Sequence, residues 1–412
     1  MAEGYHNRAL SLYIHIPFCR AKCSYCDFLS FGGCDWNKHQ EYVEALCNEI
    51  SAYALIAEQY RIETIFIGGG TPSFIDAVLI EQIMDTVRSV FVVEEYAEIT
   101  IEGNPDSLTA DKLIAYRRAG INRLSIGLQS ANDDMLQMLG RVHSYGQFIN
   151  AFHCARQAGF VNINIDIMSG LPGEGVEEYV YTLDRVTELQ PEHISAYSLI
   201  VEEDTPLGCN EELLDLLPDE EQDRLLYAKT KSLLKSSGYN RYEISNYAKE
   251  DRECRHNIVY WTGGEYLGVG IGAASYLKIQ SGAGSRRLIR FHGAEDMETY
   301  IGMFSCRDRL LQLGSEDENN FLLEFLQSYY RDLYFSKRSD EMEEFMFLGL
   351  RLMQGISKAE FKVRFGIGIE KIYGKVIAKY RNSGLLLESG DRLYLSDKGI
   401  DVSNVIMAEF MI

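Results

Sequence analysis

The chain has 412 residues, an apolar fraction of 46% and a formal net charge of −21. This length exceeds one typical domain, and the composition is that of an ordinary globular protein. The longest apolar runs are strand-sized, far below the roughly 18 residues of a membrane span, and the acidic surface disfavours binding to a nucleic-acid backbone. Because no apolar leader precedes Leu10 either, we expect a cytoplasmic protein that does not bind nucleic acid.

Short β-branched runs alternate with helical patterns through roughly residue 200, which predicts a parallel sheet built from βαβ units. The predicted strands cover 12–16, 64–67, 98–102, 123–126, 162–168 and 193–199, and helical periodicity covers 35–59. Six such units are fewer than the eight of a closed barrel, so we expect a partial (β/α)6 barrel. Polar and glycine-rich signals follow the strand ends, which is where the reactive face of such a barrel lies.

Three cysteines follow the first predicted strand directly, in the spacing Cys19-x3-Cys23-x2-Cys26. A [4Fe–4S] cluster held entirely by protein takes four thiolates, so a set of three leaves one iron free to bind a small molecule. The same cysteines could instead hold zinc, with Cys34, His15 or His39 as the fourth ligand. The odd count of nine cysteines argues against a secreted disulfide framework.

The chain beyond residue 215 changes character twice. A helix is predicted over 219–237 with Asp219 at its N-cap, and the glycine-rich stretch 266–275 suggests close backbone approach to a ligand or cluster. From residue 297 the sequence becomes helical and charged, with an amphipathic helix over 341–353 and two short strands around Ser389-Gly390-Asp391. We expect a barrel over 1–215, an extension over 216–296, and a helical, winged-helix-like domain over 297–412.

These motifs together carry a family resemblance. The cysteines preceded by Tyr13-Ile14-His15-Ile16-Pro17-Phe18, with Gly68-Gly69-Gly70-Thr71-Pro72 after the second strand, resemble the radical S-adenosylmethionine superfamily. Further motifs narrow the match to the oxygen-independent coproporphyrinogen III oxidase group and, within it, the HemW branch of heme chaperones. These motifs are Glu102-Gly103-Asn104-Pro105, Ser125-Ile126-Gly127-Leu128-Gln129-Ser130, Gly170-Leu171-Pro172-Gly173 and His256-Asn257-x-x-Tyr260-Trp261.

The resemblance implies a [4Fe–4S] cluster on Cys19, Cys23 and Cys26, whose fourth iron takes the amino nitrogen and carboxylate of S-adenosylmethionine. It also implies a set of residues around that cosubstrate: Tyr13, Tyr25, Gly69, Gly70, Thr71, Glu102, Gln129, Arg141 and Asp166. The chemistry suits this, because carboxylates accept from ammonium and hydroxyl groups and a guanidinium forks onto a carboxylate. Each polar residue could instead cap a helix or form a surface pair.

Two details of the resemblance favour the chaperone over the oxidase. The oxidases carry another cysteine two residues after the third, and this chain has Phe28 there. The second detail is the motif from His256 to Trp261, which resembles the heme-associated motif of the HemW branch. It implies His256 as an axial ligand, with Tyr260 and Trp261 stacking on the macrocycle. His15 is a second candidate ligand, and either histidine could instead be a buried core residue.

The implied function is heme binding and delivery to acceptor proteins, including respiratory enzymes. It also implies an electron donor for the cluster and transient membrane association through a partner. The alternative is an enzyme, a coproporphyrinogen III oxidase that decarboxylates two propionates to vinyl groups. A zinc-stabilised acidic interaction protein is a third possibility. No catalytic residue is assigned from the sequence.

Overall fold

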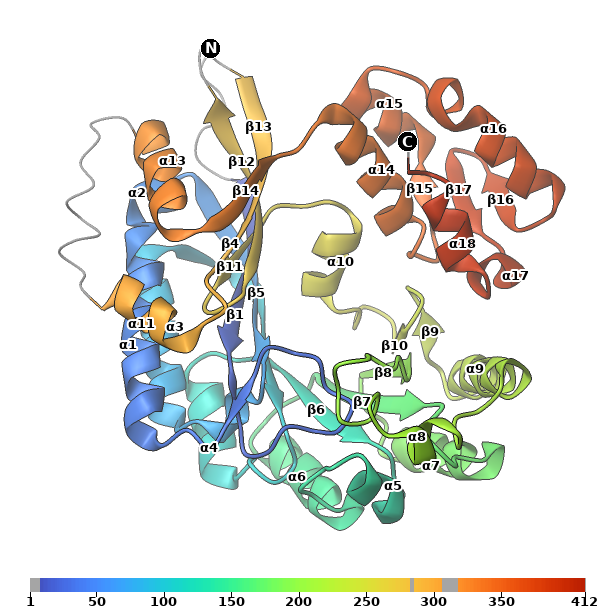
Figure 1. The fold of residues 1–412 in the computed structure, drawn as a ribbon, viewed down its shortest axis with the longest axis horizontal. Coiled ribbons are helices and arrows are strands. Elements are labelled where there is room, and N and C mark those ends of the chain that lie inside the picture. Colours follow the sequence, from blue (N-terminus) through green and yellow to red (C-terminus); the bar gives the residue numbers. More distant parts are fainter. Residues whose placement is uncertain (1–7, 282–284, 306–317, 412) are drawn as a thin grey trace.

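The computed structural model describes residues 8–281, 285–305 and 318–411. In this part of the chain, twelve strands form one sheet in the order β14-β13-β12-β11-β1-β4-β5-β6-β7-β8-β10-β9. Six neighbours run parallel, as βαβ connections require: β1 (Arg8–Ile16), β4 (Tyr60–Gly69), β5 (Val92–Gly103), β6 (Arg123–Gln129), β7 (Ile163–Ser169) and β8 (His193–Ser198). All six predicted strands are found, and the partial (β/α)6 barrel is confirmed (Figure 1).

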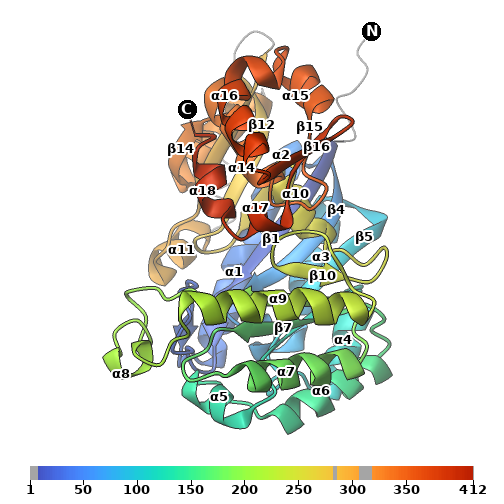
Figure 2. The ribbon, with the colours of Figure 1, turned by 90° about the vertical axis from the view of Figure 1, so that its right-hand side faces the viewer.

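Helices cover the outer face of these strands (Figure 1). They are α1 (Trp36–Ala52), α3 (Ala77–Val90), α4 (Ala110–Arg118), α5 (Asp133–Met138), α6 (Tyr145–Gln157), α7 (Val176–Glu188) and α9 (Glu220–Ser236). The short α8 (Glu211–Leu214) projects to one side in Figure 2. The helix predicted over 35–59 is divided at Tyr53, after which a short α2 (Ala54–Ala57) follows. The helix predicted over 219–237 is α9, and the Asp219 side chain accepts from the Gln222 N–H as its N-cap.

The sheet stays open because its two ends turn antiparallel. On one side, β11 (Tyr266–Val269) pairs parallel with β1 and leads into β12 (Ala274–Ser281), β13 (Ser285–His292) and β14 (Arg331–Phe335). On the other side, β10 (Asn246–Ala248) and β9 (Asn240–Arg241) extend from β8.

The glycine-rich stretch between β11 and β12 packs against protein. A Cβ at Gly270, where φ is +100°, would lie 2.7 Å from the Tyr42 hydroxyl and 2.8 Å from the His15 carbonyl oxygen. The close approach predicted for this stretch is therefore to the end of β1 and to α1.

Two hydrophobic cores divide the molecule. The first fills the barrel and includes α11 (Met297–Phe304) and α13 (Glu318–Tyr329) through Tyr300, Phe325 and other side chains. Glu49 of α1 anchors this part: its buried carboxylate accepts from the Gly270 N–H at 2.8 Å, from the Tyr300 hydroxyl at 2.5 Å and from the Tyr330 hydroxyl. Residues 297–305 and 318–335, grouped with the C-terminal domain from sequence, thus pack with the barrel.

The second core begins at Met342 and belongs to a separate C-terminal unit. The unit contains α14 (Arg338–Gly349), β15 (Ile356–Ser357), α15 (Lys358–Phe365), α16 (Ile369–Asn382), β16 (Leu386–Ser389), β17 (Arg392–Leu395), α17 (Asp397–Ile400) and α18 (Ser403–Ala408). The predicted helix 341–353 is α14, shifted toward the N-terminus because the chain enters the helix at Lys337 and leaves it at Leu350. The unit sits above α9 (Figure 2). In the described residues, no helix is long and apolar enough to cross a membrane.

Candidate functional site

The three cysteines lie on a loop between two short strands, β2 (Phe18–Cys19) and β3 (Phe31–Gly32), which pair with each other. All three are free thiols; Cys19 is buried, and Cys23 and Cys26 are half-buried. Backbone hydrogen bonds fix the middle of the loop: the Ser24 N–H donates to the Leu139 carbonyl at 3.0 Å, and the Leu207 N–H donates to the Ser24 carbonyl at 2.8 Å. The thiols are therefore held against the carboxyl edge of the sheet by two other strand-end loops.

His15 fastens the same loop to β1. Its Nε2 lies 2.9 Å from the Leu29 carbonyl oxygen, and its Nδ1 lies 3.0 Å from the Tyr13 hydroxyl. Since a carbonyl only accepts, Nε2 carries the proton and Nδ1 accepts from Tyr13. Burial lowers the pKa of His15, so the ring stays neutral at physiological pH. Both ring nitrogens are engaged, which removes His15 as a zinc or heme ligand in this structure.

The other two candidate zinc ligands, His39 and Cys34, pack against apolar and aromatic side chains. His39 is buried on α1 between aromatic rings, with its ring centroid 4.3 Å from that of Phe18 and 5.5 Å from that of Phe74. Cys34 is half-buried against the first core. Among the described residues, no group of three or more His, Cys, Asp or Glu side chains is arranged to hold a single metal ion.

A glycine turn at the end of β4 faces the cysteine loop. The Gly70 N–H donates to the Ile16 carbonyl at 2.9 Å, and the Thr71 N–H donates to the Phe18 carbonyl at 2.8 Å. At Gly69 φ is +114°, and an added Cβ would lie 2.6 Å from the His15 ring. Only glycine satisfies both demands, so the turn exposes bare backbone beside the thiols.

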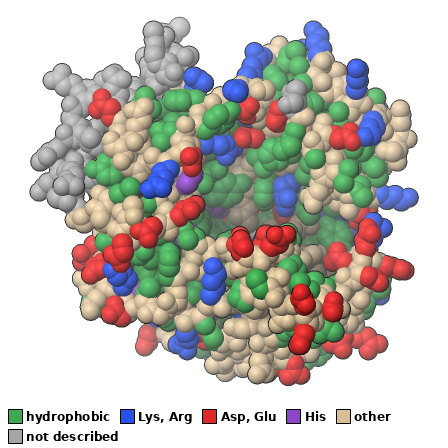
Figure 3. All heavy atoms as spheres, viewed as in Figure 1, with side chains coloured by type: hydrophobic (Ala, Val, Ile, Leu, Met, Phe, Trp, Pro, Cys, Tyr) green, Lys and Arg blue, Asp and Glu red, His purple; other side chains and the backbone are tan. Residues whose placement is uncertain are grey.

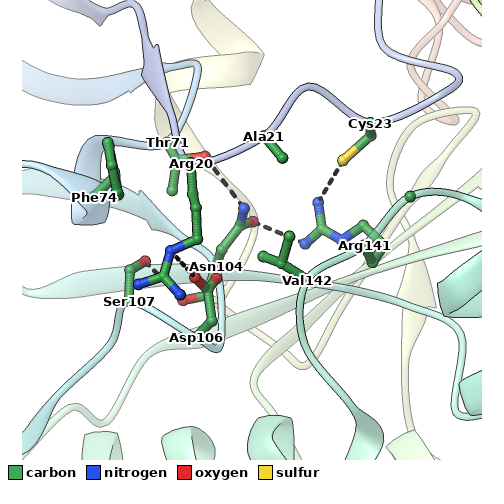
Figure 4. A pocket seen from close by; sticks show the side chains of 11 residues that line it. Arg20, Ala21, Cys23, Thr71, Phe74, Asn104, Asp106, Ser107, Arg141 and Val142 are labelled. Atoms are coloured by element: carbon green, nitrogen blue, oxygen red, sulfur yellow. Dashed lines mark hydrogen bonds and ion pairs between the residues drawn. The ribbon is translucent and has the colours of Figure 1, made fainter. Parts of the chain in front are cut away.

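Arg141 links the cysteine loop to the strand ends (Figure 4). Its Nη1 lies 3.5 Å from Cys23 Sγ, and its Nη2 donates to Asn104 Oδ1 at 2.8 Å and to the Gly127 carbonyl at 2.6 Å. Asn104 in turn donates to Thr71 Oγ1 at 3.2 Å, and this hydroxyl lies 3.5 Å from Cys19 Sγ. One chain of polar contacts thus connects two of the three thiols. No role was predicted for Asn104, although its position directly after β5 places it at the edge where the other site residues were expected.

Two carboxyl groups lie on adjoining parts of this edge without an ion-pair partner in the described residues. The pKa of Glu102 is raised to about 8, mainly by burial and secondly by the nearby negative charge of Asp166. The hydrogen bond that Glu102 accepts from the Gly69 N–H at 3.2 Å opposes this shift. Burial also raises the pKa of Asp166, which accepts from Ser125 Oγ at 2.9 Å and Asn164 Nδ2 at 2.8 Å. A cation placed between such groups would restore their usual acidity, so the arrangement suits a positively charged ligand.

Gln129 and Tyr25 complete the predicted set. Gln129 ends β6 with φ +72°, a left-handed conformation that costs energy for any residue with a side chain. A Cβ at Gly127 would lie 3.1 Å from both Gln129 Nε2 and Arg141 Nη2, so the bare glycine lets these two donors converge. Tyr25 packs into a small cluster with Leu139 and Met168 beside the loop. The structure thus gathers the nine predicted cosubstrate residues at one edge of the sheet.

The motif residue His256 lies elsewhere, on α10 (Arg255–Trp261) inside the concave face of the sheet (Figure 1). Its side chain is 1% exposed. Nδ1 is 2.8 Å from Thr64 Oγ1, and Nε2 is 3.0 Å from the Tyr260 hydroxyl. Burial lowers the pKa of His256 to about 3. Both nitrogens of His256 are engaged and the ring is enclosed in this structure, and the axial-ligand role stays a prediction.

The following residues of the motif are more accessible. Tyr260 stacks edge-on against His256 and Tyr266. The Arg351 guanidinium, from the C-terminal unit, lies 4.3 Å from the Trp261 ring centroid. Trp261 Nε1 and Arg351 Nε have no hydrogen-bond partner among the described residues. Both nitrogens are buried where the barrel meets the C-terminal unit, and the face of the molecule drawn in Figure 3 is deeply hollowed.

The arrangement of thiols, glycine turn and buried carboxyls on a partial barrel is that of a radical S-adenosylmethionine protein. The Radical SAM superfamily matches residues 13–186, and the HemN C-terminal domain matches residues 337–402. A protein from Bacillus subtilis named heme chaperone HemW is 34% identical over 97% of this chain and 99% of its own length. The chain belongs to the HemW family.

Other relatives agree with this membership. The heme chaperone HemW of Lactococcus lactis is 32% identical over 98% of this chain and 97% of its own length. That of Escherichia coli is 40% identical over 64% of this chain and 69% of its own. In fold, the chain resembles the coproporphyrinogen III oxidase HemN of Escherichia coli, with a TM-score of 0.81, 23% identity, and coverage of 100% of this chain and 91% of that one.

Membership of the radical SAM superfamily implies a [4Fe–4S] cluster and S-adenosylmethionine. The residues present fit both groups. Three free thiols share one loop, glycine backbone at Gly69 and Gly70 lies beside that loop, and the buried acids Glu102 and Asp166 suit the positive charge of the cosubstrate.

Proposed function

We propose that this protein is a cytoplasmic heme chaperone, which binds heme and hands it to acceptor proteins, including respiratory enzymes. The relatives named heme chaperone span the barrel and the C-terminal unit alike, so both parts belong to the proposed activity. Membrane association would be transient and would depend on the acceptor, and an electron donor would serve the cluster.

The cluster would be held by Cys19, Cys23 and Cys26. A [4Fe–4S] cluster bound there supplies one-electron chemistry to the sulfonium of bound S-adenosylmethionine. Arg141, 3.5 Å from Cys23 Sγ, would stabilise the thiolate by its positive charge. Thr71, 3.5 Å from Cys19 Sγ, would do so as a hydroxyl donor.

The cosubstrate would lie across the strand ends. Backbone at Gly69 and Gly70 would meet its methionyl portion, while Glu102 and Asp166 would accept hydrogen bonds from its ammonium and ribose hydroxyls. Gln129 would contact the ribose, and Arg141 would contact the carboxylate of S-adenosylmethionine. Tyr13 and Tyr25 would pack beside it. Ligand binding would lower the raised pKa of Glu102, because the carboxylate would gain a cationic partner.

One observation favours delivery over turnover. The oxidases that this chain resembles carry a further cysteine at the position of Phe28, and the Phe28 side chain is 70% exposed. An exposed aromatic ring beside the cluster loop suits contact with a flat apolar ligand or a partner. Trp261, a half-buried ring next to Arg351, would offer a second aromatic contact.

The test uses the full chain, reconstituted anaerobically with iron and sulfide, titrated with heme and then incubated with S-adenosylmethionine, a reductant and coproporphyrinogen III. We expect saturable heme binding and no vinyl product. Formation of protoporphyrinogen over many turnovers would overturn the chaperone proposal in favour of the oxidase.

Two cysteine variants test the cluster assignment. Cys23→Ser should abolish the brown cluster absorbance and the change in the Mössbauer spectrum on adding S-adenosylmethionine. Cys154→Ser, at a half-buried thiol on α6, should leave both unchanged. Equal cluster content in the two variants would contradict the assignment.

A further inference from the structure

A cavity of about 220 Å³ lies at the junction of the barrel with the C-terminal unit. The end of α9 and the strands β9 and β10 form one side, and Met353, which follows α14, forms the other. Figure 2 shows α9 running beneath the C-terminal unit at this junction. The cavity is remote in sequence from the cysteine loop.

Three cations line this cavity in a chain whose net charge is −21. Lys231 and Arg241 share one carboxylate, that of Asp397, whose side chain is 73% exposed; Arg241 Nη2 lies 3.4 Å from Asp397 Oδ1. Lys235 forms no ion pair among the described residues. The Asp397 carboxylate therefore faces three positive charges, and the carboxyls of Glu243 and Asp401 lie farther back, beside Tyr227.

A buried hydroxyl lines the same cavity. Tyr247 of β10 is 1% exposed, and its hydroxyl lies beside the Arg241 guanidinium, which only donates, so its O–H has no acceptor among the described residues. A phosphate oxygen that accepted from this O–H would supply the acceptor that it lacks. The Arg241 guanidinium is already oriented, since Nη1 donates to the Tyr227 hydroxyl at 2.7 Å.

The helix terminus at this cavity does not oppose an anion strongly. A helix C-terminus carries partial negative charge on its unpaired carbonyls. Here the carbonyls of Leu233, Leu234 and Lys235 accept from the N–H groups of Ser237, Tyr239 and Gly238. The cations thus dominate the local potential.

We propose that this cavity binds the phosphate group of a small molecule. A phosphate oxyanion suits a cavity lined by two lysines and an arginine, since lysine and arginine are the usual phosphate donors. The volume of about 220 Å³ holds more than a bare ion, which fits a phosphate ester. Lys235 and the Tyr247 hydroxyl supply the unused donors, and Asp397 competes with the ligand for Lys231 and Arg241.

Because Asp397 belongs to the C-terminal unit and the cations belong to the barrel, ligand binding would exchange a contact between the two units for a contact to phosphate. The proposal uses no residue assigned to heme or to the cluster, so it can be tested separately from the proposed chaperone function.

The test is isothermal titration of the full chain with inorganic phosphate and with adenosine monophosphate at constant ionic strength. Lys235→Gln should weaken binding at least tenfold, and Asp397→Asn should tighten it because the internal competitor is removed. Tyr247→Phe should weaken binding without lowering the melting temperature. Lys229→Gln, at an exposed position of the same helix, is the matched control and should change nothing.

The two probes distinguish the source of the phosphate: tighter binding of the nucleotide assigns an ester, and tighter binding of inorganic phosphate assigns the free ion. The proposal is overturned if neither probe binds at millimolar concentration. It is also overturned if Lys235→Gln and Lys229→Gln bind with the same affinity, or if Asp397→Asn binds more weakly than the unaltered chain.

Discussion

Replacing Gly69 by alanine tests whether bare backbone at the end of β4 shapes the site. Two costs add. A φ of +114° costs a residue with a Cβ about 1–2 kcal/mol, and the added methyl would lie 2.6 Å from the His15 ring. Overpacking of this kind costs about 1–3 kcal/mol. We therefore expect Gly69→Ala to lower the free energy of unfolding by about 2–5 kcal/mol.

The displaced ring matters more than the lost stability. His15 holds the cysteine loop through Leu29, so its movement should reduce the affinity for S-adenosylmethionine at least tenfold. Urea denaturation followed by circular dichroism measures the first effect, and isothermal titration of the reconstituted protein the second. Gly384→Ala is the control, because φ there is +71° and no atom lies within 4 Å of the added Cβ. Equal destabilisation by the two substitutions, with S-adenosylmethionine binding retained, would refute the reasoning.

Three further outcomes follow from named contacts. Arg141→Met should weaken S-adenosylmethionine binding at least tenfold and destabilise the fold, because Asn104 and the Gly127 carbonyl lose a donor. The control is Arg118→Met, which removes an exposed ion pair with Glu81 and should lower the free energy of unfolding by under about 1 kcal/mol in urea titration. Burial raises the pKa of Glu49 to about 7, so Glu49 keeps its proton to higher pH in the folded than in the unfolded chain, and its contribution to stability should be lost as pH rises through 7. Glu49→Gln should therefore reduce the change in the urea unfolding midpoint between pH 5 and pH 8. An unchanged dependence of the midpoint on pH would contradict this. His256→Gln should leave the Soret maximum of bound ferric heme in place while lowering the urea midpoint; a shifted maximum would restore His256 as an axial ligand.

Much of the barrel and of its reactive edge follows from sequence because both rest on local rules. Parallel strands buried on both faces are β-branched runs, and their carboxyl ends meet at one edge. That rule alone brings Gly69, Glu102, Gln129 and Asp166 together. The carboxyl-edge site therefore needed no knowledge of packing.

The roles of the histidines could not be predicted in the same way, because their partners are distant in sequence. His256 meets Thr64 across 192 positions, and His15 meets Leu29 across 14. A histidine that is free to bind a metal and one whose ring nitrogens are both engaged have the same local sequence. The pairing of Arg141 with Cys23, 118 positions apart, was hidden for the same reason, since strand-end loops choose their neighbours only in the folded chain.

The contacts of buried Glu49 determine when the first helix can complete its packing during synthesis of the chain. Its hydroxyl partners, Tyr300 and Tyr330, lie 251 and 281 positions downstream, so the first helix cannot reach its final environment until most of the chain has left the ribosome. Contacts of such long range slow folding and prolong the exposure of apolar surface. A nascent chain halted near residue 296 would lack both tyrosines and would be a natural client for general folding factors, whereas the C-terminal unit, with its own core, can mature last and alone.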